Sequence, residues 1–511
     1  MPLSPEDRRE IAGRAATVFE RAGALGADTA PVRPDAAAHA ALSRWQRVFA
    51  PVDPASFARR LGWDGLDEAR ALEAIAAPVD PTALEPAHWT VWLDRIVDEA
   101  AGVAADLRDG RLPSASPGDA HPFEELRVPF RRAGRRELLR AVSRAPAHPS
   151  GATPLEVVDP CIFGHLQAQL DLEIVRTAEL AWYERFERDR FAAGASAAPD
   201  SGSSSIYRAF VLGLLEGGLS AFFRDYAWLA RQLATILARW VEASAELLIA
   251  VRDDRARLCE VFSPGADPGL VVAIEPALSD PHHGRRRVAA LTFASGLRVV
   301  YKPRSIRIEE AFGRLIDRLN PGLDVPLRVP RTLECGTHGW VEFVEPSPAA
   351  SVEEAARYFR RAGALMCITW MLGARDLHRE NLVAAADGPV LIDLELLLQP
   401  TTDGVFENED GATAASCLAT GMLSMIEIGP DGEPHDAGGL RGESTGTLPV
   451  AARSWRQCGT DALSFDEQTS FSAPRRHELR LGDVVQRPDA YPDDLKAGFA
   501  DAFRLLIERR A

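Results

Sequence analysis

The fold of the second half of this chain is decided by the stretch DLHRENLVAAADGPVLIDLELLL (376–398). It begins as a short polar loop and continues into an apolar run, 389–398, whose composition predicts a β-strand. Because alternate residues of a strand share a face, Asp393 and Glu395 should project side by side. Two carboxylates within an apolar run are costly unless a cation neutralises them, so the stretch predicts a charged site.

Secondary-structure signals around this stretch predict two contrasting parts, which together indicate an α+β fold. Residues 1 to about 190 are rich in helix-forming residues, and 206–251 predicts two or three packed helices broken near Gly217 and Asp225. From about residue 270 the sequence changes to short β-branched runs, with a Ser-Gly hairpin turn at 295–296. Strands are expected at 269–278, 287–295, 298–303 and within 331–346, and helices at 308–320, 351–373 and about 492–509.

Composition and charge exclude several classes of protein. The chain has 511 residues, a formal net charge of −16 and 46% hydrophobic residues, which is typical of a globular protein. An acidic chain lacks the basic face that broad nucleic-acid binding needs, so no nucleic-acid partner is expected. The six cysteines form no C-x-x-C pair and none is next to a histidine, which predicts no zinc site and fits a reducing cytoplasm. The N-terminus is no signal peptide, and no membrane span is expected because no uncharged apolar run is long enough.

Asp376, Asn381 and Asp393 have the order and spacing of a phosphotransferase site. Protein-kinase-type enzymes use one Asp on a loop to orient or deprotonate the acceptor hydroxyl, and an Asn and a second Asp to hold Mg²⁺ against the nucleotide phosphates. Carboxylate and amide oxygens are the ligands that Mg²⁺ prefers. Each short motif alone would be read as a polar turn or a strand end that meets solvent, but motifs in this order favour a function.

Lys302 is the candidate nucleotide-binding lysine. It ends an alternating β-run, RVVYKP (298–303), and precedes an amphipathic helix, which is the position from which a kinase lysine reaches the α- and β-phosphates and a helix Glu. Glu309 and Glu310 are both candidate partners, and the sequence does not choose between them. The alternative is an ordinary surface lysine, although lysines are very few in this Arg-dominated chain.

The turn SDPHHGRRRV (279–288) stands where a kinase carries its glycine-rich loop. It has a single glycine, so its backbone cannot cradle phosphates, but Arg285 and Arg286 could clasp them through bidentate contacts. A solvated hairpin loop and a partner-peptide site are the alternatives. His282 and His283 are adjacent and point apart, so a metal site is not expected in this turn.

Taken in order, the motifs of this chain resemble those of class II lanthipeptide synthetases. The shared segments are YRAFVLGLLEGGL (207–219), SDPHHGRRRV (279–288), VVYKPRS (299–305), WVEFVEP (340–346), LGARDLHRENL (372–382), VLIDLELL (390–397) and TGML (420–423). The resemblance is to the N-terminal dehydratase region of LanM-type enzymes. It implies ATP- and Mg²⁺-dependent phosphorylation of Ser and Thr in a leader-bearing precursor peptide, followed by phosphate elimination to dehydroalanine and dehydrobutyrine.

The resemblance also implies an atypical, lipid-kinase-like fold behind a helical N-terminal part. On this basis the chain is expected to divide into a helical N-terminal region (1–200) and a helical segment that packs on the kinase-like core (201–268). A small β-rich N-lobe (269–346) and a larger, mainly helical C-lobe (347–511) then form a bilobal kinase-like domain.

Three groups of site residues follow from the resemblance and from the arginines of the 279–288 turn. The expected catalytic residues are Asp376 and His378 of the D-x-H motif, with Asp280 and His282 of a second D-x-H turn. The expected nucleotide-binding residues are Lys302, Arg285, Arg286, and Glu342 to Val344 in the segment that links the lobes beside adenine. The expected Mg²⁺ ligands are Asn381 and Asp393, with Glu395 as a second acidic residue.

Some departures from the family pattern bear on the chemistry. Members usually have glycine where Ser279 and Arg285 stand, and Ala419 stands where an Arg is common. The chain reaches Ala511 before the Arg/Thr pair that supports phosphate elimination in the family, and before the zinc-dependent cyclase domain. The expectation is therefore a truncated C-lobe without a cyclase domain, which is either a shortened form of such an enzyme or a stand-alone kinase-like protein whose product stays phosphorylated. A separate cyclase protein is a possible partner.

Two other classes of function stay open from the sequence. A small-molecule phosphotransferase of the aminoglycoside-kinase kind would share Asp376, Asn381 and Asp393, but a small acceptor needs no long helical N-terminal region. A catalytically dead peptide-binding scaffold would usually have lost one of these residues or Lys302, and all four are present.

Overall fold

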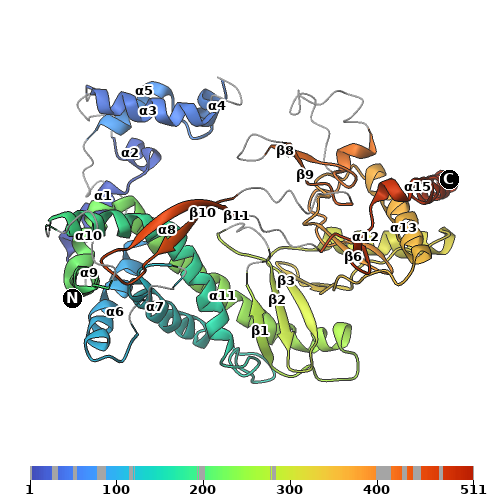
Figure 1. Ribbon diagram of the computed structural model, residues 1–511, viewed down its shortest axis with the longest axis horizontal. Helices are drawn as coiled ribbons and strands as arrows, with labels where there is room; N and C mark the ends of the chain where they lie inside the picture. The colour runs from blue at the N-terminus through green and yellow to red at the C-terminus, as the bar shows by residue number, and fades with distance from the viewer. Residues whose placement is uncertain are drawn as a thin grey trace. The chain divides into compact units, whose positions relative to one another are not determined.

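In the computed structural model the chain forms two compact units (Figure 1). The structure describes residues 3–25, 33–49, 55–77, 88–113, 115, 119, 121–192, 194, 202–276, 278, 284–398, 416–428, 434–440, 450–470 and 476–509. Unit 1 comprises Met1–Ala145, Leu166–Glu246 and Trp455–Phe465, and unit 2 comprises Pro146–His165, Leu247–Ser454 and Asp466–Ala511. The four-region division expected from the sequence stays a prediction.

Unit 1 is helical, as the composition of its residues predicts. Its helices are α1 (Pro5–Arg14), α2 (Val18–Ala24), α3 (Ala36–Phe49), α4 (Ser56–Trp63), α5 (Glu68–Ala76), α6 (Thr90–Arg108), α7 (Glu124–Ser143), α9 (Ser205–Gly213) and α10 (Leu219–Asp225), with parts of α8 (Ile162–Ala192) and α11 (Ala227–Phe262). The predicted helix breaks are confirmed, because a π-helical turn separates α9 from α10 and α11 begins only after Tyr226. Gly217 in that turn has a φ of 135°, which favours glycine.

An aromatic cluster fills the centre of unit 1. Phe123 stacks on Tyr207, with ring centroids 5.5 Å apart, and meets Trp182 and Phe186 edge-on. The buried Tyr207 hydroxyl donates to Glu125 at 3.0 Å and accepts from the backbone N–H of Phe123 at 3.1 Å. A large aromatic residue is stably buried when its hydroxyl has such partners, so these contacts tie the start of α7 to α8 and α9.

One helical segment of unit 1 is long and apolar enough to cross a membrane by length and composition alone. It runs over Ser205–Asp225, and 44% of its most apolar window is buried inside the protein. Buried core helices pass the same test, and this segment places Tyr207, Phe222 and Phe223 in the interior of unit 1. The expectation that the chain has no membrane span therefore stays a prediction.

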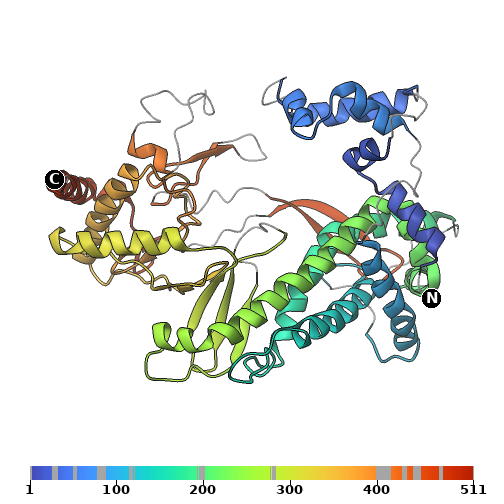
Figure 2. The same cartoon turned by 180° about the vertical axis from the view of Figure 1, so that it is seen from behind.

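Unit 2 combines a small antiparallel sheet with helices (Figures 1 and 2). The strands are β1 (Val271–Glu275), β2 (Ala289–Phe293), β3 (Arg298–Lys302), β4 (Thr332–Glu334) and β5 (Gly339–Glu342), in the order β1-β2-β3-β5-β4. β2 and β3 form the predicted hairpin, and Gly296 in its turn has a φ of 87°. The amphipathic helix expected after β3 is α12 (Arg307–Leu319). A helical N-terminal part followed by this mixed part confirms the α+β class.

The rest of unit 2 comprises helices, a buried hairpin and short strands. Its elements are α13 (Val352–Met371), α15 (Pro492–Glu508), the hairpin of β6 (Leu382–Ala385) and β7 (Gly388–Leu391), and the short strands β8 (Ile426–Ile428), β9 (Pro434–Asp436), β10 (Val450–Arg456), β11 (Ser464–Ser470), β12 (Arg480–Leu481) and β13 (Val484–Val485). Two of these, β10 and β11, continue into unit 1. The strand predicted at 389–398 was too long, because β7 ends at Leu391 and the chain then turns. Asp393 therefore lies in the irregular segment after β7 and Glu395 in the turn that follows, and not on one strand face; we call residues 393–395 the acidic turn.

Two glycines bring α13 and α15 into backbone contact (Figure 2). A Cβ added at Gly363 would lie 1.9 Å from the carbonyl oxygen of Leu495, and one at Gly498 would lie 1.8 Å from that of Arg360. Neither approach is possible for a larger residue without moving a helix. The pair explains why two glycines are tolerated inside helices that form the core of unit 2.

We predict that Gly363→Ala destabilises the protein by about 2 kcal/mol or more, because the methyl group overpacks the α13–α15 contact. Gly313→Ala in α12 is the control, since the nearest atom to its new Cβ would lie 3.9 Å away and Ala is the better helix former. Urea unfolding followed by circular dichroism measures both variants. Equal midpoints for the two variants would contradict the proposed packing.

Candidate functional site

Lys302 is a buried charge with specific partners. Its side chain is only 4% exposed, and its ammonium group donates to Glu309 Oε1 at 3.1 Å and to the carbonyl oxygen of Ile392 at 2.7 Å. Glu309 is itself buried in the first turn of α12. The structure thus chooses Glu309, while Glu310 pairs within its own helix. A buried ammonium needs such partners, so the reading of Lys302 as a surface lysine is wrong.

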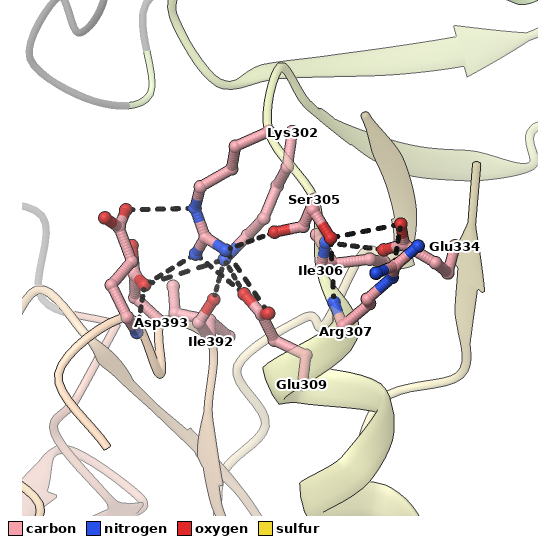
Figure 3. Close-up of polar contacts among 10 residues, drawn as sticks. Lys302, Ser305, Ile306, Arg307, Glu309, Glu334, Ile392 and Asp393 are labelled. Atoms are coloured by element: carbon pink, nitrogen blue, oxygen red, sulfur yellow. Dashed lines mark hydrogen bonds and ion pairs between the residues drawn. The ribbon is translucent and has the colours of Figure 1, made fainter. Parts of the chain in front are cut away.

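Arg304 supplies the cation that Asp393 and Glu395 require, beside the contacts of Lys302 with Glu309 and Ile392 that Figure 3 shows. Its Nη2 lies 2.7 Å from Glu309 Oε1 and 2.9 Å from Asp393 Oδ1, and its Nε lies 3.0 Å from Glu395 Oε1. Lys302 adds a weaker contact, with Nζ 3.9 Å from Asp393 Oδ1. The sequence predicted a cation beside the two carboxylates but did not identify it as Arg304. The only sequence signal for this residue is its position two residues after Lys302.

The β6–β7 hairpin brings Asn381 and Asp393 to one end. Leu382, the first residue of β6, pairs with Leu391, the last residue of β7. Asn381 directly precedes that pair and Asp393 follows it by two residues, and the backbone N–H of Ile392 donates to the carbonyl oxygen of Asn381 at 3.0 Å. An antiparallel hairpin whose strands are fully buried therefore fixes the two predicted metal ligands beside each other.

The loop before β6 folds Asp376 and His378 towards Asn381. The side-chain amide of Asn381 donates to the carbonyl oxygen of Asp376 at 2.8 Å, so its oxygen is the atom that can bind a cation. His378 Nδ1 accepts from the backbone N–H of Glu380 at 3.1 Å, which leaves the proton of a neutral ring on Nε2. That Nε2 lies 3.6 Å from Asp376 Oδ1.

Asp376 has the conformation and the charge environment of a functional residue. Its φ is 65°, a left-handed conformation that Asp and Asn tolerate better than most residues. Burial raises the pKa of Asp376 above its ordinary value, His378 opposes the shift, and the charges of Asp393 and Glu395 add to it. The influence of these two carboxylates on its pKa places Asp376 in the same electrostatic environment as the turn after β7.

Close backbone contacts hold this loop in place. The N–H of Leu377 donates to the carbonyl oxygen of Thr420 at 2.8 Å, and that of Arg379 donates to Ala437 at 2.9 Å. A Cβ at Gly439 would lie 2.4 Å from the carbonyl oxygen of Leu377, and Gly421 adopts a φ of 76°. The motif TGML (420–423) therefore positions the loop that carries Asp376 and His378.

The predicted adenine segment has two different environments. Glu342 accepts from Arg328 at 3.1 Å and from the backbone N–H of Arg331 at 3.1 Å, so its carboxylate is neutralised by side chains of unit 2. Val344 is buried in a small apolar cluster with Val383, Ala385 and Val390, against which Ile392 packs. This cluster joins the segment after β5 to the β6–β7 hairpin, next to the residues that contact Lys302.

Part of the predicted phosphate turn lies outside the described residues. Asp280 and His282 are not described, so their expected catalytic roles stay predictions. Arg285 and Arg286 are described just before β2, and their expected phosphate contacts also stay predictions. Arg285 has a φ of 68° and follows Gly284 with a φ of 81°, so it occupies a position that favours the glycine of related sequences.

A second polar cluster was missed by sequence reasoning. Asp254, Cys335 and His338 bring one potential ligand atom each within 4.8 Å of one another. His338 Nε2 lies 2.6 Å from Asp254 Oδ2, Trp340 Nε1 donates to the same oxygen at 2.8 Å, and Arg257 lies 3.4 Å from Cys335 Sγ. The motif search could not find this cluster, because Asp254 comes from α11 and the other two from the β4–β5 turn. The expected absence of zinc stays a prediction.

Comparisons with known proteins identify the family of this chain. A family model described as "Domain of unknown function (DUF4135)" matches residues 226–511, more than half of the chain, so the chain belongs to this family. It is also similar to the lacticin 481/lactococcin biosynthesis protein LcnDR2 of Lactococcus lactis subsp. lactis, with 26% identity over 252 residues and 45% of this chain covered. The chain spans about a quarter of that relative's length. Together the matches confirm the resemblance to class II lanthipeptide synthetases.

We predict that Cys335 resists alkylation in the folded protein at pH 8. Burial raises the pKa of its thiol to about 12, and Asp254 adds to the shift, so the reactive thiolate is scarce. Mass-spectrometric mapping of iodoacetamide labelling, with glutathione as the free-thiol reference, should show a rate at least 100-fold lower for Cys335. Labelling at the glutathione rate while the protein stays folded would contradict this environment.

Proposed function

We propose that this chain phosphorylates Ser and Thr residues of a leader-bearing precursor peptide with ATP and Mg²⁺, as a step in lanthipeptide modification. The observation that carries the proposal is the buried Lys302–Glu309 pair beside Asp393, with Asn381 at the same end of the β6–β7 hairpin. The similarity to a lantibiotic biosynthesis protein supports the role in lanthipeptide modification.

The nucleotide would lie between the sheet and the β6–β7 hairpin of unit 2. Lys302 is held by Glu309, as the lysine of a kinase is held by a helix Glu, and its ammonium would meet the α- and β-phosphates. The apolar cluster around Val344 and Val383 would pack against adenine. Arg285 and Arg286 would add phosphate contacts from the turn before β2.

The donor set after the loop fits Mg²⁺. Asp393 and Glu395 offer carboxylate oxygens and Asn381 offers an amide oxygen, which are the hard ligands that this ion selects. When bound there, Mg²⁺ would neutralise the phosphate charge and orient the γ-phosphoryl group. The residues of the chain keep these ligands in place through the hairpin register and the Asn381–Asp376 hydrogen bond.

Asp376 would orient the acceptor hydroxyl and take its proton. The hydroxyl oxygen forms a bond to the γ-phosphorus, the bond from that phosphorus to the β-phosphate oxygen breaks, and ADP leaves. The raised pKa of Asp376 makes its carboxylate a better proton acceptor than an exposed Asp. His378, 3.6 Å away, would keep that carboxylate oriented. Asp280 and His282 would complete the site from the second D-x-H turn.

Phosphate elimination would follow if the elimination machinery is complete. The phosphorylated residue then loses its α-proton and its phosphate, and dehydroalanine or dehydrobutyrine forms. Ring closure would be the task of a cyclase domain or a separate cyclase protein. The cytoplasm is the proposed compartment, because its reducing conditions would keep the six cysteines as the free thiols that the structure holds.

We predict that an ATP analogue bearing a lysine-reactive acyl phosphate labels Lys302 and that excess ATP with Mg²⁺ prevents the labelling. The sequence has only two lysines, so Lys496 on α15 is an internal control that ATP should not protect. Peptide mapping by mass spectrometry gives both yields. Lys302→Met should lose ATP-dependent activity at least 100-fold, and unprotected labelling of both lysines would refute the nucleotide site.

We predict that Asp376→Asn and Asp393→Asn each lower phosphoryl transfer at least 1,000-fold without unfolding the chain. Asn keeps the size of Asp and tolerates the positive φ at residue 376, while it removes the proton acceptor or the metal-binding charge. Transfer is measured by mass spectrometry of a Ser/Thr/Cys-rich leader-bearing peptide encoded beside the protein. Asp317→Asn, on an exposed position of α12, is the matched control.

The same spectra separate the competing functions. A gain of phosphate without later loss of water identifies a kinase that does not eliminate, and loss of water identifies a dehydratase. An unmodified peptide from a chain that still binds ATP would favour a peptide-binding scaffold, and phosphorylation of a small hydroxyl compound alone would favour a small-molecule kinase. Full-rate transfer by Asp393→Asn would refute the metal assignment.

A further inference from the structure

Arg304 stands where the proposed metal ligands converge. Its guanidinium contacts Asp393 Oδ1 at 2.9 Å, Glu395 Oε1 at 3.0 Å and Glu309 Oε1 at 2.7 Å, so one cation pairs with three carboxylates. The metal assignment of Asp393 and Glu395 requires the same carboxylates to bind Mg²⁺. Two cations held by the same carboxylates repel each other.

The charges around Arg304 are nearly balanced without a metal ion. Glu309, Asp393 and Glu395 supply three negative charges, and Lys302 and Arg304 supply two positive charges. A divalent cation added with Arg304 in place would change the net charge of these five side chains from −1 to +1. A nucleotide brings several negative charges with the metal, and these offer the guanidinium a new bidentate partner.

The geometry allows the side chain of Arg304 to move while its backbone stays fixed. The next two residues are anchored to Glu334, which accepts from Ser305 Oγ at 3.1 Å and from the Ile306 backbone N–H at 2.6 Å. Figure 3 shows these anchors on the opposite side of the Lys302 strand end from Asp393. The long arginine side chain can therefore exchange partners by rotamer changes alone.

We propose that Arg304 is an internal counter-cation that gates the metal site. In the absence of a nucleotide, its guanidinium pairs with Asp393 and Glu395. When a nucleotide binds, the guanidinium moves to the nucleotide phosphates and the divalent cation binds the two carboxylates. The inference rests on the proposed function in one respect, the assignment of Asp393 as a metal ligand. It adds that metal and nucleotide bind in a coupled way, so the free cation binds weakly.

The test measures binding of Mn²⁺ alone, followed by electron paramagnetic resonance of the free ion. Arg304→Gln should bind Mn²⁺ at least 10-fold more tightly than the native chain, because the competing charge is gone. Arg307→Gln is the matched control, since it removes the same charge three residues away, where the side chain is 79% exposed and faces Glu334. Adding Asp393→Asn to Arg304→Gln should abolish the gain.

A second arm measures the coupling. Addition of ADP should tighten Mn²⁺ binding more in the native chain than in Arg304→Gln, because only the native chain must first release its own cation. Mn²⁺ affinity in Arg304→Gln that equals or falls below that of Arg307→Gln, with both proteins folded by circular dichroism, would overturn the gate. That result would contradict the role of Arg304 but would not contradict phosphoryl transfer by the native chain, which the peptide spectra test separately. An increase in Mn²⁺ affinity that persists when Asp393→Asn is added to Arg304→Gln would also overturn the proposed gate.

Discussion

The buried ion pair between Lys302 and Glu309 is the constraint on which the candidate site depends. Both side chains are less than one-tenth exposed, so each would carry a large desolvation cost without the other. Removing one partner of such a pair typically costs about 3–5 kcal/mol. The end of β3, the first turn of α12 and the residue after β7 must therefore stay together, since Lys302 also bonds to Ile392. The sheet and the hairpin are aligned by this one ammonium group.

The acidic turn after β7 has a different relation to stability. Asp393 and Glu395 are partly exposed, and their attraction to Arg304 is screened by solvent. We expect the loss of either carboxylate to cost little stability, because an ion pair at a partly exposed position contributes at most about 1 kcal/mol. The charges of these two carboxylates also raise the pKa of Asp376. A role in binding a charged group therefore explains them better than a role in folding.

Elements that depend on the local sequence pattern could be predicted. Contacts between residues that come from separate elements could not. The β2–β3 hairpin and α12 follow from alternation and helical spacing, and the structure confirms them. The end of β7 was placed too late, because an apolar run continues through Leu394 to Leu398 after the ladder has stopped. The strand pattern carries no signal for the point at which a partner strand ends.

Arg304 and the Asp254–Cys335–His338 cluster are also features that the sequence pattern could not predict. An arginine beside a lysine has no periodicity that reveals which carboxylates it meets, and ligand-type residues from separate elements have no spacing that a motif could record. Glu309 and Glu310 are equally good candidates in sequence, and only the direction in which the first turn of α12 faces β3 separates them.

The contacts that support the loop carrying Asp376 explain which sequence departures leave its geometry unchanged. Thr420 and Ala419 contact the loop through their carbonyl oxygens, which accept from Leu377 and from Arg375 Nη1 at 2.8 and 3.3 Å. These contacts use the backbone, so an Ala in place of the Arg common in the family leaves them unchanged. The glycines differ in this respect, because Gly421 and Gly439 allow close backbone approaches that a side chain would block. The departure at residue 419 thus leaves unchanged the backbone contacts that hold the loop carrying Asp376.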